Sequence, residues 1–218
     1  MVRDAAVCAA ADRRVQAGTR LLQLALAHHL ATETDVWQLG RAASGARIVT
    51  QGPGPVPVLS VTHSGDLLAV AVAASDQGCV GIGIDIERPR PRSYAKIARY
   101  LGWPESLWGV PQAPTQDEFL HVWTLWEALY KSMPDGSLDE LRAALAAAGH
   151  IRAGAAGVVS AENWSACSRR GPEGCWLSVV SQPGGSSAFG MFRVDRLAGD
   201  VDSARIETIT APEGEFHF

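Results

Sequence analysis

The chain has 218 residues, of which 47% are hydrophobic and 19% charged, as expected for a globular protein of one sizeable domain or two small lobes. Its net charge of −4 excludes the global basic field that attracts nucleic acids or anionic membranes, so an anionic substrate must be held by local cations. No segment approaches the roughly 18 apolar residues of a membrane span, and the first residues lack a signal-peptide pattern. We therefore expect a cytoplasmic protein with reduced cysteines.

The first predicted element is a helix. Apolar residues recur at helical spacing from Asp12 to Leu30, with Asp12 as a possible N-cap. The arginines on this helix, Arg13, Arg14 and Arg20, would from the pattern alone form a solvated face. Arg41 and Arg47 follow in a polar segment that contains Gly and Ser.

A β-hairpin is expected next. Residues 52–57 contain three prolines and should form a loop. The aliphatic runs Val58–Val61 and Leu67–Ala74 then bracket a Ser-Gly-Asp turn, with His63 at the mouth of the hairpin. A histidine at such a turn is either polar surface or part of a site.

Residues 80–87, VGIGIDIE, alternate strictly and predict a strand. One face carries isoleucines, and the other carries Gly83, Asp85 and Glu87. Same-face neighbours lie roughly 7 Å apart, so Asp85 and Glu87 can reach one cation, and the small Gly83 would leave room for a ligand. The alternative is an edge strand that shows its charges to water.

Residues 119–131, FLHVWTLWEALYK, predict a helix that is apolar around most of its circumference and is therefore buried. At helical spacing, Trp126 lies in a row of aromatic residues along one side of the helix, whereas Glu127 and Lys131 lie together on a neighbouring side. These two charges either form a simple i,i+4 salt bridge or serve a site, because a buried charge requires a partner.

The remaining elements carry less signal. Residues 87–92, ERPRPR, form either a solvated connector or a basic lip near an acidic partner, and residues 93–107 have helical spacing. A capping box at Ser137–Glu140 opens a helix that ends near Gly149. Short strands at 157–167, 175–181 and 187–195 are expected to complete the antiparallel sheet of a second lobe.

Three motifs together resemble the 4′-phosphopantetheinyl transferase superfamily, specifically its surfactin-synthetase-type branch. They are VTHSG at Val61–Gly65, GIDIE at Gly83–Glu87 and FLHVWTLWEALYK at Phe119–Lys131. The resemblance implies an α+β fold of two similar α/β lobes with pseudo-twofold symmetry, each a small, mainly antiparallel sheet on a long helix. We expect residues 1–79 to form the nucleotide-phosphate lobe and residues 80–218 the lobe with the magnesium and transfer motifs.

The resemblance also implies an enzyme that moves the 4′-phosphopantetheine arm of coenzyme A to a serine of an apo acyl or peptidyl carrier protein and releases 3′,5′-ADP. Asp85, Glu87 and Glu127 would bind Mg²⁺, and Glu127 and Lys131 would be catalytic. The residues expected to hold coenzyme A are Arg14, Arg47, Thr62, His63 and Lys131. The expected partners are the carrier and coenzyme A, with no nucleic acid or membrane, and the protein is expected to be a monomer.

One position departs from the family pattern. The motif has lysine immediately before the metal-binding glutamate, where this chain has Trp126. We expect Trp126 to pack in the core and the activity to be retained, although slower or tuned to one carrier. The alternatives are a non-catalytic carrier-binding relative and a magnesium-dependent phosphohydrolase.

Overall fold

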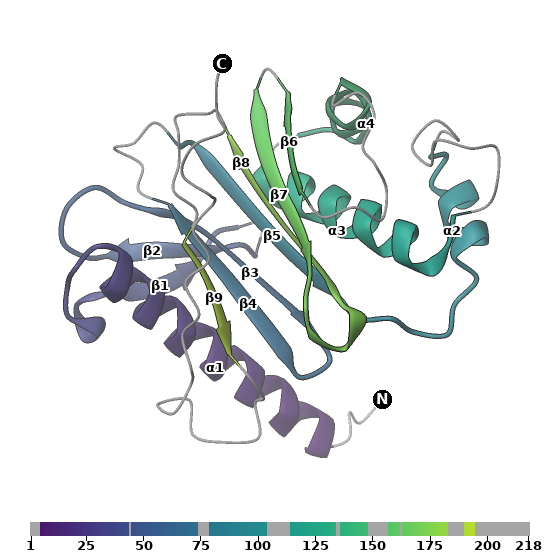
Figure 1. Ribbon diagram of the computed structural model, residues 1–218. Coiled ribbons are helices and arrows are strands. Elements are labelled where there is room, and N and C mark those ends of the chain that lie inside the picture. Colours follow the sequence, from purple (N-terminus) through teal and green to yellow (C-terminus); the bar gives the residue numbers. More distant parts are fainter. Residues whose placement is uncertain are drawn as a thin grey trace.

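The computed structural model describes residues 5–43, 45–73, 79–103, 114–133, 136–147, 157–161, 163–182 and 190–194, which form a mixed α+β fold (Figure 1). The elements in chain order are α1 (Ala5–His29), η1 (Thr34–Val36), β1 (Gln38–Arg41), β2 (Arg47–Gln51), β3 (Val58–Ser64), β4 (Leu67–Ala73), β5 (Gly81–Glu87), α2 (Tyr94–Tyr100), α3 (Gln116–Ser132), α4 (Leu138–Ala147), β6 (Gly157–Ala161), β7 (Trp164–Arg170), η4 (Pro172–Gly174), β8 (Trp176–Gln182) and β9 (Gly190–Val194). Within the described residues, no helix combines the length and apolar character that crossing a membrane requires.

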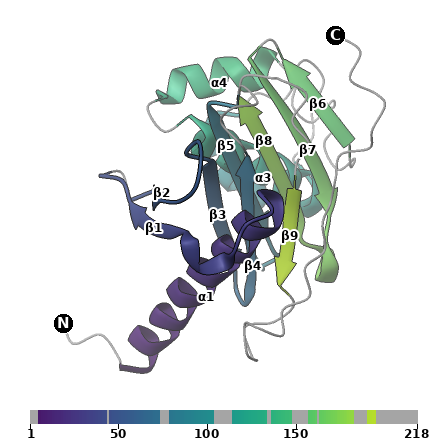
Figure 2. The same ribbon diagram turned by 90° about the vertical axis from the view of Figure 1, so that its left-hand side faces the viewer.

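The first sheet has the antiparallel order β3-β4-β9, and α1 lies across one of its faces (Figure 2). The predicted hairpin is confirmed, because β3 pairs with β4 through the turn at Gly65. The expectation that residues 187–195 complete the second lobe's sheet is wrong, because β9 pairs with β4. Every residue of β4 is buried, so this strand is central and needs a partner on each side.

The second sheet has the antiparallel order β5-β8-β7-β6, and α3 packs against it. The expected single strand at 157–167 is two strands, β6 and β7, which pair with each other. The isoleucines of β5 and the odd-numbered residues of β4 share one hydrophobic cluster between the two sheets. The sheets therefore face each other, with α1 on the outside of one and α3 on the outside of the other (Figure 1).

Where β3 runs beside β5, side-chain hydroxyls join the two sheets. Ser60 accepts a hydrogen bond from the Ile84 amide at 3.2 Å, Thr62 donates to Asp85 at 2.8 Å, and Ser64 donates to Glu87 at 2.8 Å. The three hydroxyls alternate along β3 and therefore lie on one face of the strand. This seam places the carboxylates of β5 directly beside β3.

Gly83 does not leave room for a ligand, contrary to the expectation from sequence. A Cβ at Gly83 would lie 1.8 Å from the carbonyl oxygen of Ala128, and a Cβ at Gly81 would lie 2.3 Å from that of Ser132. The space beside the strand is filled by the backbone of α3. The glycines therefore allow close contact between helix and strand, which brings Glu127 and Lys131 to the carboxylates of β5.

The lobe description remains partly a prediction. Small antiparallel sheets packed on helices are present, whereas the pseudo-twofold relation and the division between residues 79 and 80 stay predictions. The first sheet draws on both sides of that division, because β9 belongs to it. The β1–β2 hairpin was not predicted, because the sequence indicated only a polar segment there.

Candidate functional site

A cleft lies over the seam between β3 and β5 and consists of two adjoining pockets. One has a volume of about 520 Å³ and contains Arg41 and Arg47 in its wall. The other, of about 320 Å³, is lined by Asp85, Glu87 and Glu127. The residues common to both walls are Val61, Thr62, His63 and Lys131. The cleft is thus basic at one end and acidic at the other.

The acidic pocket brings together the side chains that sequence assigned to the metal and to catalysis. Asp85 and Glu87 point from the same face of β5, because side chains alternate along a strand. Glu127 and Lys131 come from successive turns of α3, and Trp123 completes the wall. The helix begins with a full capping box between Thr115 and Glu118, which fixes its start relative to the sheet.

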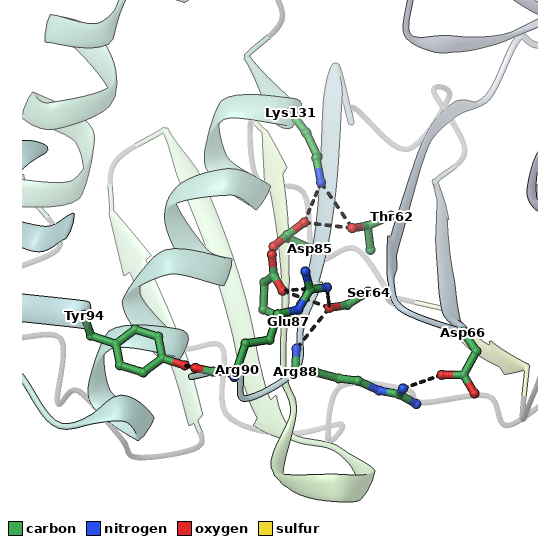
Figure 3. Close-up of polar contacts among 9 residues, drawn as sticks. All are labelled: Thr62, Ser64, Asp66, Asp85, Glu87, Arg88, Arg90, Tyr94 and Lys131. Carbon is green, nitrogen blue, oxygen red and sulfur yellow. Dashed lines mark hydrogen bonds and ion pairs between the residues drawn. The ribbon is translucent and has the colours of Figure 1, made fainter. Parts of the chain in front are cut away.

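Asp85 is held by two donors and is only 6% exposed. Its Oδ1 accepts hydrogen bonds from Lys131 Nζ at 2.6 Å and from Thr62 Oγ1 at 2.8 Å (Figure 3). Lys131 Nζ also donates to Ile84 O at 3.2 Å and to Thr62 Oγ1 at 3.3 Å. Lys131 of α3 therefore pairs with Asp85 of β5, in place of the simple bridge along the helix to Glu127.

The second oxygen of Asp85, Oδ2, is buried and has no hydrogen-bond partner among the residues that the structure describes. Burial raises the pKa of Asp85, and the ammonium of Lys131 opposes that rise. A buried carboxylate oxygen without a donor is costly. Asp85 therefore has one oxygen that a further cation or donor would satisfy.

Glu127 lies in a more negative environment. Burial raises its pKa, the negative charges of Asp85 and Glu87 raise it further, and Lys131 opposes them. A carboxylate with a raised pKa is a better proton acceptor near neutral pH than an ordinary glutamate. Glu127 thus has the electrostatic setting of a general base.

Glu87 is oriented by residues that the sequence did not predict to belong to the site. Its Oε2 accepts a hydrogen bond from Ser64, whose oxygen also accepts from Arg88 N and Arg90 Nη2, each at 3.1 Å (Figure 3). Tyr94 fixes the backbone of Arg90 by accepting from its amide and donating to its carbonyl. The signal in the sequence was the period-two run of hydroxyl residues at 60, 62 and 64.

The basic pocket holds two arginines from the β1–β2 hairpin. Arg41 donates to Gly45 O at 2.7 Å, and Arg47 donates to Val15 O at 3.3 Å. Among the described residues, neither guanidinium has a carboxylate partner. Burial and the nearby charge of Arg41 lower the pKa of Arg47. Two cations held together without a counter-charge favour an anionic ligand.

Of the other residues predicted to hold the nucleotide, two line the cleft and the side chain of the third is not described. His63 is exposed and lies in the wall common to both pockets, and Thr62 lies there too, although its hydroxyl is engaged by Asp85. The backbone of Arg14 belongs to α1, but its side chain lies outside the described residues. Thr62 thus holds the Asp85 carboxylate by a hydrogen bond, whether or not it also contacts a ligand.

The donors of the acidic pocket fit a hard divalent cation. Carboxylate oxygens are the ligands that Mg²⁺ prefers, and Oδ2 of Asp85 is a buried carboxylate oxygen without a hydrogen-bond partner among the described residues. Within the described part of the chain, no three potential ligands are gathered closely enough to hold an ion as they stand. The residues therefore fit the ion in the chemistry of their donor atoms and in lining one pocket, but not in their present distances.

Comparison with known protein families gives an independent result. Residues 81–174 match the family model of the 4′-phosphopantetheinyl transferase superfamily. The match spans β5 to η4 and includes all three acidic residues of the pocket and Lys131, whereas the arginines of the basic pocket lie outside it. No curated protein shows significant similarity to the chain. The carboxylates of the acidic pocket and Lys131 thus lie in a segment that matches the 4′-phosphopantetheinyl transferase superfamily, whereas the β3 residues of its wall do not.

Proposed function

We propose that the protein transfers the 4′-phosphopantetheine arm of coenzyme A to a serine of an apo acyl or peptidyl carrier protein. The observation that carries this proposal is the cleft formed by the two adjoining pockets. Two arginines without a carboxylate partner among the described residues lie at one end, and the carboxylates of the matched segment lie at the other. Coenzyme A carries a 3′-phosphate and a pyrophosphate, and therefore needs cations at two separated points. The surfactin-synthetase-type branch is part of the same proposal.

The basic pocket would bind the nucleotide end. Arg41 and Arg47 supply guanidinium groups suited to phosphate, and His63 adds a donor on the wall that leads to the acidic pocket. Arg14 is proposed as a further phosphate ligand. These contacts position the pyrophosphate near Lys131, which lies where the two pockets meet.

Asp85, Glu87 and Glu127 would hold Mg²⁺, which neutralises charge on the phosphate oxygens when bound. Lys131 would stabilise the leaving group, and Glu127 would accept the proton of the carrier serine. In the transfer, the serine oxygen bonds to the phosphorus of the pantetheine phosphate, and the bond from that phosphorus to the bridging oxygen breaks. The leaving 3′,5′-ADP keeps the electron pair. Phosphoryl chemistry of this kind depends mainly on positioning and charge stabilisation.

Trp126 does not disturb this arrangement. It is 8% exposed and lies 5.7 Å from Trp103, ring centroid to ring centroid, within the core cluster of α2 and α3. The tryptophan therefore packs, as expected from its place in the row of aromatic residues. The lysine that the family places there would supply a cation, so we propose that this chain transfers more slowly or prefers one carrier.

A mass-spectrometric assay tests the proposal. Apo acyl and peptidyl carrier proteins are incubated with the protein, coenzyme A and Mg²⁺, and at least one carrier should gain the mass of a phosphopantetheine arm. Glu127→Gln should reduce the rate about 100-fold or more, because a general base contributes at least that factor. Asp139→Asn removes an exposed carboxylate of α4 and should leave the rate unchanged. No mass gain on any carrier would contradict transfer, and phosphopantetheine released into water would favour a hydrolase.

A further inference from the structure

We propose that Ser64 is a positioning residue that orients the Glu87 carboxylate for the divalent cation. The inference rests on the proposed function and deepens it. Ser64 is fully buried at the seam, and its hydroxyl is 2.8 Å from Glu87 Oε2. The hydroxyl bonds to Glu87, Arg88 and Arg90, none of which lines the basic pocket, so its effect on a ligand is through Glu87.

The groups around Ser64 determine the direction in which its hydroxyl donates a hydrogen bond. A serine hydroxyl has one proton to donate and two lone pairs that can accept. Both lone pairs are used, because the hydroxyl oxygen accepts from Arg88 N and from Arg90 Nη2, each at 3.1 Å (Figure 3). The single proton is therefore directed to Glu87 Oε2, and the hydroxyl cannot reverse its role without losing a bond.

This arrangement holds one oxygen of Glu87 and leaves the other for the pocket. Oε1 makes no hydrogen bond with any residue that the structure describes. The guanidinium of Arg90 also lies 4.0 Å from Oε2, on the same side as Ser64. Hydrogen bonds that fix the orientation of a ligating carboxylate typically change metal affinity 10- to 100-fold when they are removed.

Ser60 offers a matched control on the same face of the same strand. Its hydroxyl accepts from the Ile84 amide at 3.2 Å and, among the described residues, bonds to no carboxylate. Removing it breaks a buried seam contact of similar kind. A loss of cation affinity that is specific to Ser64 therefore reports the orientation of Glu87 and not the seam in general.

The experiment measures Mn²⁺ binding to the full chain without coenzyme A, from the electron paramagnetic resonance signal of free Mn²⁺. Ser64→Ala should raise the dissociation constant about tenfold or more. Ser60→Ala should leave it unchanged, and Ser64→Thr, which keeps a hydroxyl, should stay close to the unmodified protein. Circular dichroism melting confirms that each variant is folded. If Ser64→Ala does not fold, a folded Ser64→Thr that binds Mn²⁺ tenfold more weakly than the unmodified protein contradicts the inference.

The inference is overturned by equal Mn²⁺ affinity in folded Ser64→Ala, by equal losses in Ser60→Ala and Ser64→Ala, or by no Mn²⁺ binding to the unmodified protein. Loss of affinity in Ser64→Thr as large as in Ser64→Ala would also count against it. Failure of the transferase proposal is distinguishable, because a protein that binds Mn²⁺ but modifies no carrier leaves the comparison of the serine variants intact.

Discussion

The charge of Asp85 depends on two neighbours, since only 6% of the residue is exposed and its Oδ1 accepts from Thr62 and Lys131. The two partners are not equivalent in exposure: the side chain of Lys131 is 28% exposed and that of Asp85 is 8% exposed. Without Asp85, the ammonium can reach water. Without Lys131, the carboxylate stays buried with less support.

Lys131→Met should therefore lower the free energy of unfolding by about 1–3 kcal/mol, the range for a buried polar group left without its partner. Asp85→Asn should cost less, because a neutral amide can still bond to Thr62 and a partly exposed lysine is solvated. Urea denaturation of the metal-free protein measures both. A larger loss for Asp85→Asn than for Lys131→Met would contradict this account of the pair.

His121 provides a test of how burial controls protonation. Its ring stacks on Trp176 with centroids 4.4 Å apart, and burial lowers its pKa from 6.5 to about 4, with Asp117 opposing the shift. Between these values the unfolded chain binds more protons than the folded one. Stability is therefore full above pH 6.5 and is lost as the pH falls toward 4.

His121→Phe keeps an aromatic ring on Trp176 and removes the titrating group. The unfolding free energy of the unmodified protein should fall relative to this variant by up to about 1.4 kcal/mol per pH unit below pH 6.5. Denaturant titrations at intervals from pH 7.5 to pH 4.5 measure the difference. Parallel pH profiles for the two proteins would show that folding does not lower the pKa of His121.

At the scale of elements, the contact between α3 and β5 decides whether the site is assembled. The strand approaches the helix so closely that a Cβ at Gly83 would overlap the Ala128 carbonyl oxygen. In α1, by contrast, a Cβ at Gly18 would meet Val61 Cγ1 at 3.8 Å, an ordinary contact. Substitution by alanine should therefore have opposite effects on stability at these two glycines.

Gly83→Ala should destabilise the protein by several kcal/mol, because backbone must move and overpacking commonly costs about 1–3 kcal/mol or more. Gly18→Ala should stabilise it by about 0.5–1 kcal/mol, since alanine is favoured over glycine in a helix interior. Thermal and urea unfolding measure both variants. A Gly83→Ala protein as stable as the unmodified chain would show that α3 does not pack as described.

Most of the elements that build the acidic pocket could be predicted from sequence, because β5 and α3 have strong periodic patterns. The β1–β2 hairpin could not, since its strands are mainly exposed and Val49 is their one buried side chain among the described residues. Arg41 was accordingly not assigned to the site. The partner of Lys131 also depends on how two distant elements pack, which spacing along a helix cannot give.

At the scale of the whole molecule, the chain crosses between its two sheets. It builds β3 and β4, continues through the second sheet, and returns to place β9 beside β4. Local patterns predicted a strand near residue 190 but not its partner, because pairing across more than a hundred residues leaves no local signature. The two sheets also share the cluster that contains Ala71 and Ile84.

A fragment of residues 1–79 should therefore not fold on its own. It would lack β9, expose one edge of β4, and lose the apolar contacts to β5 and β8. Circular dichroism and thermal melting of the isolated fragment are expected to show no cooperative transition. A sharp melt of the fragment would indicate an independent N-terminal domain.

The central claim is that the basic and acidic pockets form one binding site for one nucleotide. A crystal structure of the protein with coenzyme A and Mg²⁺ tests it most directly. We predict a single coenzyme A that spans both pockets, with its pyrophosphate at Lys131 and the ion bound by Asp85, Glu87 and Glu127. A nucleotide confined to one pocket, or Glu127 turned away from the other two carboxylates, would contradict the account.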